Sequence, residues 1–188
     1  MKLKFGKVNT LSNYISLFRL LLSVPVYFLL DNLHYSAHIR IYLIIAFFLA
    51  YVSDILDGYI ARKTNQISEV GKIIDPLADK VLVILIVTKL FLMGEIPAYF
   101  FWIIVLRDVL IFTGGIFVTR KIGKVIPSNI LGKVTVASIA LFLLAVVLNV
   151  RETKVLYYLL MYISITLSVA SVIGYAIRAN KSIKTGKI

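Results

Sequence analysis

Residues 53–80 read SDILDGYIARKTNQISEVGKIIDPLADK, and this stretch interrupts a chain that is otherwise mostly apolar. Four aspartates in it, Asp54, Asp57, Asp75 and Asp79, occupy fixed places in the pattern D-x2-D-G-x2-A-R-x8-G-x3-D-x3-D. The first two are three residues apart and the last two are four apart, so each pair would share one face of a helix. Carboxylates crowded in an apolar setting repel one another and are poorly solvated, which favours a hard divalent cation as their partner. The stretch therefore predicts a metal site formed by two neighbouring helices.

The composition of the whole chain indicates a polytopic membrane protein. Of 188 residues, 60% are hydrophobic and 16% are charged, which is too apolar for a soluble domain to cover its surface. Lys and Arg number 21 against nine acidic residues, giving a formal net charge of +12. These basic residues lie mostly beside apolar runs, so anionic lipid headgroups explain them better than nucleic acid does. The chain has no cysteine, which excludes disulfides and thiolate metal ligands.

Six apolar runs approach the length of about 20 residues that a membrane-spanning helix needs. They cover residues 14–31, 40–61, 72–93, 98–118, 131–149 and 155–177. We therefore expect an all-α membrane protein with six transmembrane helices, forming a single domain over residues 1–188. Residues 1–8 alternate lysines with apolar residues, which fits either a basic tail or a short helix on the membrane surface. The first apolar run lacks a small-residue cleavage site, so we expect no cleaved signal peptide.

Basic residues are distributed unevenly between the two sides that six spans define. On the side of both chain ends they are Lys2, Lys4, Lys7, Arg62, Lys63, Arg120, Lys121, Lys124, Arg178, Lys181, Lys184 and Lys187. On the opposite side they are Arg40, Lys89, Arg151 and Lys154. By the positive-inside rule the termini and the loop of the aspartate motif are cytoplasmic. The short loop between the second and third runs makes these helices antiparallel neighbours, with their carboxylates at the cytoplasmic face of the membrane.

The motif is the signature of the CDP-alcohol phosphatidyltransferases, and the chain resembles that family. The matching positions are Asp54, Asp57, Gly58, Ala61, Arg62, Gly71, Asp75 and Asp79. Eight fixed positions at fixed spacings argue against chance agreement. Members of this family are integral membrane enzymes that move a substituted phosphate from a CDP-linked donor to an alcohol and release CMP. The resemblance also implies a homodimer.

The resemblance implies a role for each residue of the motif. Three aspartates, Asp54, Asp57 and Asp75, would hold one or two divalent ions, Mg²⁺ or Mn²⁺, at the donor pyrophosphate. Asp79 would complete the metal site and act as the general base on the acceptor hydroxyl. The residues expected around the CDP part are Asn13, Gly58, Ala61, Arg62, Ser68 and Gly71.

Structural interpretations of several of these residues stay open. Asp75 precedes Pro76 and could cap a helix. The membrane glycines could serve helix packing alone, and Ser68 could be an ordinary loop serine. Arg19, in the predicted first span, could extend to the membrane surface instead of taking part in a site.

The acceptor is less strongly indicated than the donor. The chain length, the six spans and the element from Asn13 to Arg19 resemble the branch that transfers phosphatidyl from CDP-diacylglycerol to glycerol 3-phosphate. Cations expected to bind this phosphorylated acceptor are Arg107, Lys133 and Arg178. Alternatively, Arg107 pairs with Asp108 or another acid, and Lys133 faces lipid headgroups. The run from Arg107 to Val109 resembles cardiolipin synthases of the same fold, which use phosphatidylglycerol, and this alternative stays open.

A different class, a divalent-cation transporter, would also explain carboxylates within a membrane. It gives no reason for Gly58, Arg62 and Gly71 at their spacings, and a cation path would not favour Arg62 beside it. A purely structural membrane protein explains none of the motif.

Overall fold

The computed structural model describes residues 11–64, 71–122 and 129–185, and of the aspartate motif it describes helix backbone only. These residues form six α-helices and one short 3₁₀ helix, with no strand among them, which confirms the predicted all-α class. The helices belong to two compact units, Met1–Met93 and Gly94–Ile188. The prediction of a single domain remains a prediction.

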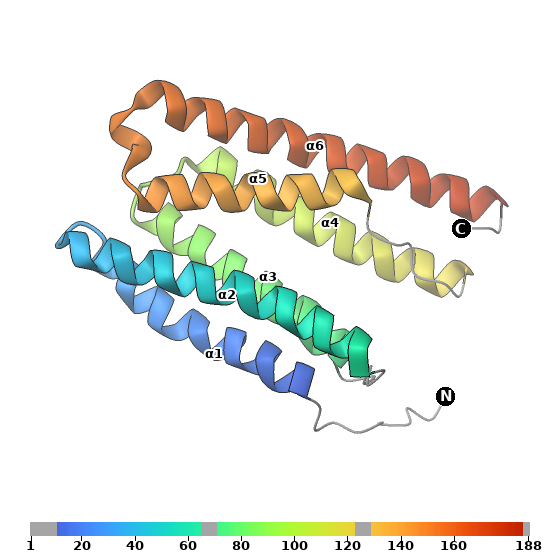
Figure 1. Cartoon of the computed structure of the whole chain (residues 1–188). Helices are drawn as coiled ribbons and strands as arrows, with labels where there is room; N and C mark the ends of the chain where they lie inside the picture. The colour runs from blue at the N-terminus through green and yellow to red at the C-terminus, as the bar shows by residue number, and fades with distance from the viewer. Residues whose placement is uncertain (1–10, 65–70, 123–128, 186–188) are drawn as a thin grey trace. The chain divides into compact units, whose positions relative to one another are not determined.

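The first unit consists of α1 (Leu11–Asp31), α2 (Ala37–Thr64) and α3 (Gly71–Leu92). Consecutive helices run in opposite directions, so α2 and α3 are antiparallel as expected (Figure 1). In the described part of this unit, however, the extensive contacts are those of α1 with α2 and of α1 with α3. The predicted packing of α2 on α3 at the motif involves residues whose side chains are not described, so it remains a prediction.

Apolar packing and one ion pair stabilise the first unit at the end away from the motif. Side chains without exposed surface are Val26, Leu30, Leu43, Val87 and Leu90. Lys89 of α3 pairs with Asp31 at the end of α1, and its ammonium lies 4.2 Å from the centre of the Tyr27 ring. A lysine this deeply buried requires such partners, because an unpaired ammonium would lose its hydration without compensation.

The second unit consists of α4 (Ala98–Ile122), α5 (Ile130–Val147), the 3₁₀ helix η1 (Val150–Glu152) and α6 (Lys154–Thr185). The long helix α6 packs against both α4 and α5 (Figure 1). At the start of α5, the side chain of Asn129 accepts a hydrogen bond of 2.8 Å from the Gly132 N–H, which caps the helix.

Aromatic and hydroxyl side chains join the helices of the second unit. The Phe100 and Phe142 rings lie 4.6 Å apart, and the Phe142 and Tyr157 rings 5.3 Å apart. The Thr135 hydroxyl donates to the Leu167 carbonyl of α6 at 3.1 Å. Hydroxyls that bond to helix carbonyls in this way let polar residues lie in an apolar interface without unpaired groups.

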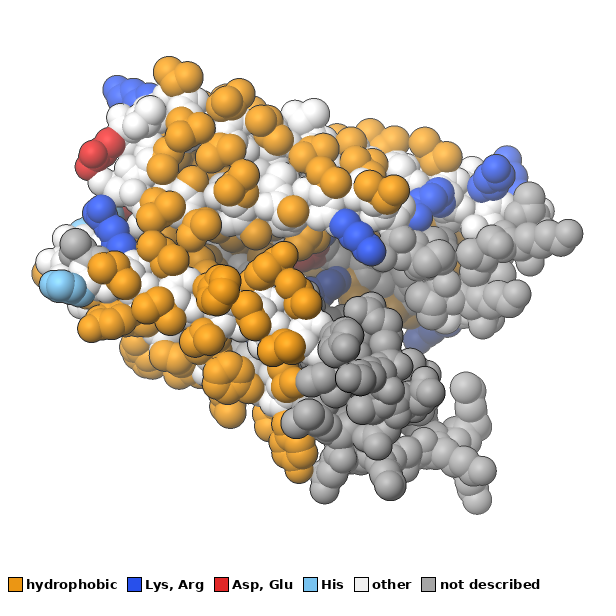
Figure 2. All heavy atoms as spheres, viewed as in Figure 1, with side chains coloured by type: hydrophobic (Ala, Val, Ile, Leu, Met, Phe, Trp, Pro, Cys, Tyr) orange, Lys and Arg blue, Asp and Glu red, His pale blue; other side chains and the backbone are white. Residues whose placement is uncertain are grey.

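The outer surface of the helices is apolar, as a lipid-facing surface requires. Large hydrophobic side chains cover much of the face seen in Figure 2, and Phe48, Phe117 and Ile177 are each 62–64% exposed. Within the described residues, four helical stretches are long and apolar enough to cross a membrane: Tyr14–Asp31, Ala98–Arg120, Ile130–Val147 and Lys154–Lys184. A shorter apolar stretch, His38–Ser53, lies in α2. The chain is an integral membrane protein, and the count of six spans stays a prediction for α2 and α3.

Candidate active site

The aspartates of the motif lie within two continuous helices. Asp54 and Asp57 belong to α2, and Asp75 and Asp79 belong to α3. The helical backbone confirms the premise of the spacing argument, since residues three or four apart on a helix share a face. The side chains of these four residues lie outside the described part of the structure. The described residues themselves contain no group of three acidic, histidine or cysteine side chains that could hold a metal.

The topology of the first unit brings the predicted donor site to one end of that unit. The second half of α2 carries Gly58, Ala61 and Arg62, and α3 begins at Gly71. Asn13 lies in the first turn of α1, which starts at this same end (Figure 1). Ser68 lies among residues 65–70, which are outside the described residues. The backbone thus supports a common location for the motif and Asn13, while their side-chain contacts remain predictions.

Arg19 is a buried residue beside the motif, and its burial decides between the two interpretations of its role. Only 2% of its surface is exposed, so it does not extend to the membrane surface. Its Nε donates a hydrogen bond of 3.2 Å to the hydroxyl of Ser53 on α2, which in turn donates to the Ala50 carbonyl at 2.8 Å. Ser53 directly precedes Asp54, so this bond joins α1 to the residue next to the first aspartate of the motif.

Arg107 lies in a hydrogen-bonded group between α4 and α6. Its Nη1 is 2.5 Å from the carboxylate of Asp108, and its Nε donates to the Ser171 hydroxyl at 3.2 Å. Both charged side chains are largely buried, with 10% and 14% of their surface exposed. This is the pairing that the structural alternative for Arg107 predicted. It leaves other guanidinium donors available, because an Arg side chain has five N–H groups in a fixed fork.

Lys133 and Arg178 lie closer than Arg107 to one end of the second unit, measured along the helix axes. Lys133 is exposed in the first turn of α5, and Arg178 lies near the end of α6, where its Nε donates to the Gly174 carbonyl at 3.4 Å. Since α5 and α6 are antiparallel, both residues are at the same end of the unit (Figure 1). Ser171, the partner of Arg107, is seven residues before Arg178, about 10 Å along the helix axis. The structure therefore does not gather the three predicted acceptor cations at one level.

Tyr175 is a further polar residue in this region that the sequence did not indicate. Its buried hydroxyl has no hydrogen-bond partner within the described structure. Its ring lies on α4 at Gly114, where a Cβ would be 3.1 Å from the Tyr175 Cε1. The paired glycines at 114 and 115 were the available signal, because they allow an aromatic ring to approach the backbone of α4.

Comparison with known proteins identifies the family of the chain. The model of the CDP-alcohol phosphatidyltransferase family matches residues 9–170, which include parts of both units. The chain belongs to this family and is a phosphatidyltransferase enzyme. This membership supports the enzyme interpretation over the cation transporter and the purely structural protein.

Individual relatives cover most of the chain, from 79% to 95% of its length. A CDP-diacylglycerol–glycerol-3-phosphate 3-phosphatidyltransferase of Aquifex aeolicus is 36% identical over 91% of this chain and 96% of its own length. A protein with the same name from Mycoplasma pneumoniae is 31% identical over 95% of this chain and 89% of its own length. A third, from Rickettsia bellii, is 30% identical over 79% of this chain and 81% of its own length.

Proposed function

We propose that this enzyme transfers a phosphatidyl group from CDP-diacylglycerol to glycerol 3-phosphate and releases CMP. The observation that carries the proposal is that relatives with this activity in their names align over nearly the full length of both chains. The aspartate motif supports the donor half of the reaction, because four carboxylates, if they converge as the sequence predicts, would suit a bound metal and a CDP pyrophosphate.

The donor set of the motif fits a divalent ion. Asp54 and Asp57 lie on one continuous helix and Asp75 and Asp79 on another, so the two positions of each pair share one helix face. Carboxylates are the hard oxygen ligands that such an ion prefers. We assign the metal, Mg²⁺ or Mn²⁺, to these four carboxylates. Such an ion, when bound, neutralises charge on the pyrophosphate of the donor.

The protein's own residues then position the donor and accept a proton. Six residues are assigned to binding the CDP part of the donor: Asn13, Gly58, Ala61, Arg62, Ser68 and Gly71. In the transfer step a hydroxyl oxygen of the acceptor bonds to the phosphatidyl phosphorus, and the bond from that phosphorus to the CMP oxygen breaks. Asp79 takes the proton of that hydroxyl as general base. CMP leaves with the electrons of the broken bond.

Arg19 is expected to support this site through Ser53. Arg19→Ala would leave the Ser53 hydroxyl without its arginine donor in a buried place, and we expect a loss of about 1–3 kcal/mol in unfolding free energy. Because Ser53 precedes Asp54, the Mg²⁺ concentration for half-maximal activity should also rise. Thermal unfolding in detergent and a metal titration of activity measure the two effects.

The matched control for Arg19 is Ser23→Ala. Ser23 is also buried on α1, but its hydroxyl donates at 2.6 Å to the Leu20 carbonyl of its own helix and does not reach α2. The Ser23→Ala variant should need the same Mg²⁺ concentration for half-maximal activity as the unchanged protein. If Arg19→Ala alters stability but leaves the metal requirement unchanged, Arg19 has a structural role only.

Acceptor binding is expected to depend on Lys133 and Arg107. A phosphorylated alcohol brings a dianion next to an anionic donor, so fixed cations should lower its apparent KM. We expect Lys133→Ala and Arg107→Ala each to raise the KM for glycerol 3-phosphate about tenfold, while the KM for CDP-diacylglycerol changes little. Arg178 is assigned the same role. Initial rates with each substrate varied in turn measure these constants.

The pairing of Arg107 with Asp108 requires a second variant. Arg107→Ala leaves a largely buried carboxylate unpaired, which costs about 3–5 kcal/mol of stability on its own. The double variant Arg107→Ala, Asp108→Ala removes both charges and should recover much of that stability. If it also recovers the KM for glycerol 3-phosphate, Arg107 does not bind the acceptor.

A panel of acceptors tests the proposed reaction as a whole. Purified protein is incubated with CDP-diacylglycerol and, separately, glycerol 3-phosphate, phosphatidylglycerol, serine or inositol phosphate, and CMP release is measured. Of these four acceptors, we expect only glycerol 3-phosphate to cause CMP release. Release with phosphatidylglycerol in place of glycerol 3-phosphate would replace the proposal with a cardiolipin synthase, the alternative that Arg107 to Val109 suggested.

We place the active site at the cytoplasmic face of the cytoplasmic membrane, with both termini on that side. In the second unit, basic residues gather at the end where α4 and α6 finish and α5 starts: Arg120, Lys133, Arg178, Lys181 and Lys184. This distribution supports the assignment through the positive-inside rule. By family resemblance we also propose that the enzyme acts as a homodimer within membrane lipid.

A further inference from the structure

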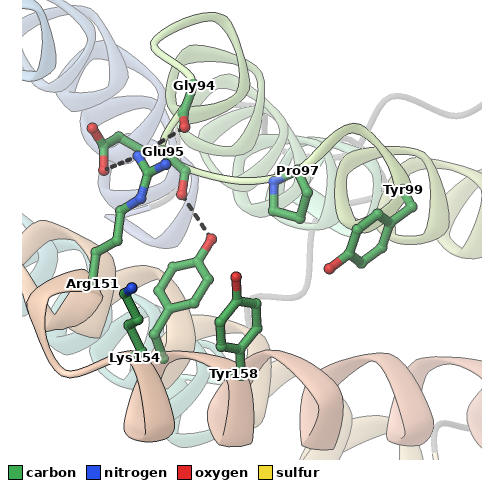
Figure 3. Close-up of a pocket in the computed structure, with 8 residues that line it drawn as sticks. Gly94, Glu95, Pro97, Tyr99, Arg151, Lys154 and Tyr158 are labelled. Carbon is green, nitrogen blue, oxygen red and sulfur yellow. Dashed lines mark hydrogen bonds and ion pairs between the residues drawn. The ribbon is translucent and has the colours of Figure 1, made fainter.

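A cavity of about 460 Å³ lies at the other end of the second unit, away from Lys133 and Arg178. It is formed by the segment before α4, the first turn of α4, η1 and the first turns of α6 (Figure 3). Its lining residues are Gly94, Glu95, Pro97, Tyr99, Arg151, Lys154, Tyr157 and Tyr158. The volume is within the range of about 300–1,000 Å³ that small-molecule sites occupy.

Hydrogen bonds hold one wall of this cavity in place. Arg151 of η1 donates to the Gly94 carbonyl at 2.9 Å and lies 3.4 Å from the Glu95 carboxylate. The Tyr157 hydroxyl donates to the Glu95 carbonyl at 2.8 Å. Gly94 has a φ of +73°, a left-handed conformation that favours glycine at this turn. These contacts join the segment before α4 to η1 and α6, so the cavity is preformed.

The polar groups that remain around the cavity suit an anion. Glu95 is buried and compensates the charge of Arg151, which leaves Lys154 as the uncompensated cation of the lining. Lys154 is exposed, and the described structure gives it no ion-pair partner. It is the first residue of α6, where the helix dipole adds positive potential. The Tyr158 hydroxyl points toward the cavity (Figure 3), whereas the Tyr99 hydroxyl donates to the Met161 sulfur at 3.6 Å.

The location of the cavity indicates a lipid as its occupant. Two of the stretches long enough to cross a membrane begin at Ala98 and Lys154, so the cavity lies where headgroups meet the bilayer. The surface beside Lys154 is apolar and exposed: Val155 is 81% exposed and Leu159 54%. A phospholipid places its phosphodiester at this level and its acyl chains along such a surface.

We propose that this cavity binds the headgroup of an anionic phospholipid. The Lys154 ammonium pairs with the phosphodiester, and the Tyr158 hydroxyl donates a hydrogen bond to a headgroup oxygen. The acyl chains lie against Val155 and Leu159. This inference does not depend on the proposed reaction, because the cavity contains no residue assigned to the donor or the acceptor.

Lipid binding to purified protein tests the proposal. Native mass spectrometry of the detergent-solubilised protein, titrated with phosphatidylglycerol or phosphatidylcholine, gives dissociation constants for the first lipids bound. We expect Lys154→Gln to weaken phosphatidylglycerol binding about tenfold, as loss of a charge-assisted contact would. Lys154→Arg should retain it, and phosphatidylcholine binding should be the same in all variants.

The matched control is Lys184→Gln, the same change at an exposed lysine near the opposite end of α6. It should bind phosphatidylglycerol as the unchanged protein does. Equal losses in Lys154→Gln and Lys184→Gln would mean that overall charge, not the cavity, attracts the lipid, and would overturn the proposal. Unchanged binding in Lys154→Gln would overturn it as well. Displacement of the lipid by inorganic phosphate would show that a free anion, and not a lipid, is the occupant.

Discussion

Replacement of Asp79 by asparagine is expected to lower turnover about 10²-fold or more, the usual size of a general-base effect. Asparagine keeps the shape of the side chain but cannot accept the proton of the acceptor hydroxyl. The initial rate of CMP release at saturating CDP-diacylglycerol and glycerol 3-phosphate measures the effect. Because the change is nearly isosteric, helix α3 should be retained, which circular dichroism and thermal unfolding can verify.

A second aspartate variant separates catalysis from donor binding. Asp57→Asn removes a carboxylate assigned to the metal but not to proton transfer, so it should weaken CDP-diacylglycerol binding more than Asp79→Asn does. Donor dissociation constants for the two variants make this comparison. Near-native turnover in Asp79→Asn would mean that another residue is the base.

Removal of divalent ions is expected to abolish activity. The four carboxylates of the motif would repel one another without a cation, and the pyrophosphate of the donor would lose its neutralising partner. Treatment with a chelator should therefore reduce CMP release to background, and added Mg²⁺ or Mn²⁺ should restore it. The measurement is a titration of activity against free metal concentration after dialysis.

The metal titration also has a variant control. Asp54→Asn should shift the half-maximal metal concentration upward, because one of the proposed ligands loses its charge. Lys154→Gln, at the opposite end of the second unit from Lys133 and Arg178, should leave it unchanged. Undiminished turnover after thorough chelation would contradict the assignment of the motif as a metal site.

The helices could be predicted well from the sequence, because apolar runs of spanning length have few alternatives in a membrane. Their ends were less predictable. The last apolar run stops at residue 177, but α6 continues to Thr185. Three basic residues lie in this extension: Arg178, Lys181 and Lys184. They favour it because Arg and Lys are good helix formers and can extend their charges toward water from a helix end.

The contacts of isolated charged residues could not be predicted. Arg19 lies 34 residues from Ser53, and Arg107 lies 64 residues from Ser171, so no local pattern relates them. Their burial depends on which helix faces meet, such as those of α1 with α2 and of α4 with α6, and the sequence does not specify these faces. The cavity at Lys154 likewise depends on the pairing of Arg151 with Glu95, 56 residues away.

The motif itself was recognisable because its spacing is local. Once each aspartate pair lies in a helix, its two members share one helix face whatever the tertiary structure is. This holds for Asp54 with Asp57 and for Asp75 with Asp79. The acceptor residues have no such local relation: Arg107, Lys133 and Arg178 come from three helices. This explains why the donor half of the reaction follows from the sequence and the acceptor half requires experiment.

The most direct test of the proposed reaction follows both products at once. Purified protein is incubated with CDP-diacylglycerol, Mg²⁺ and isotopically labelled glycerol 3-phosphate, and CMP and labelled lipid are quantified together. We predict that the two products form in equal amounts, that both form about 10²-fold more slowly or slower still in Asp79→Asn, and that neither forms above background after chelation. Release of CMP without incorporation of label into lipid, or formation of both products at undiminished rates in Asp79→Asn, would contradict the account.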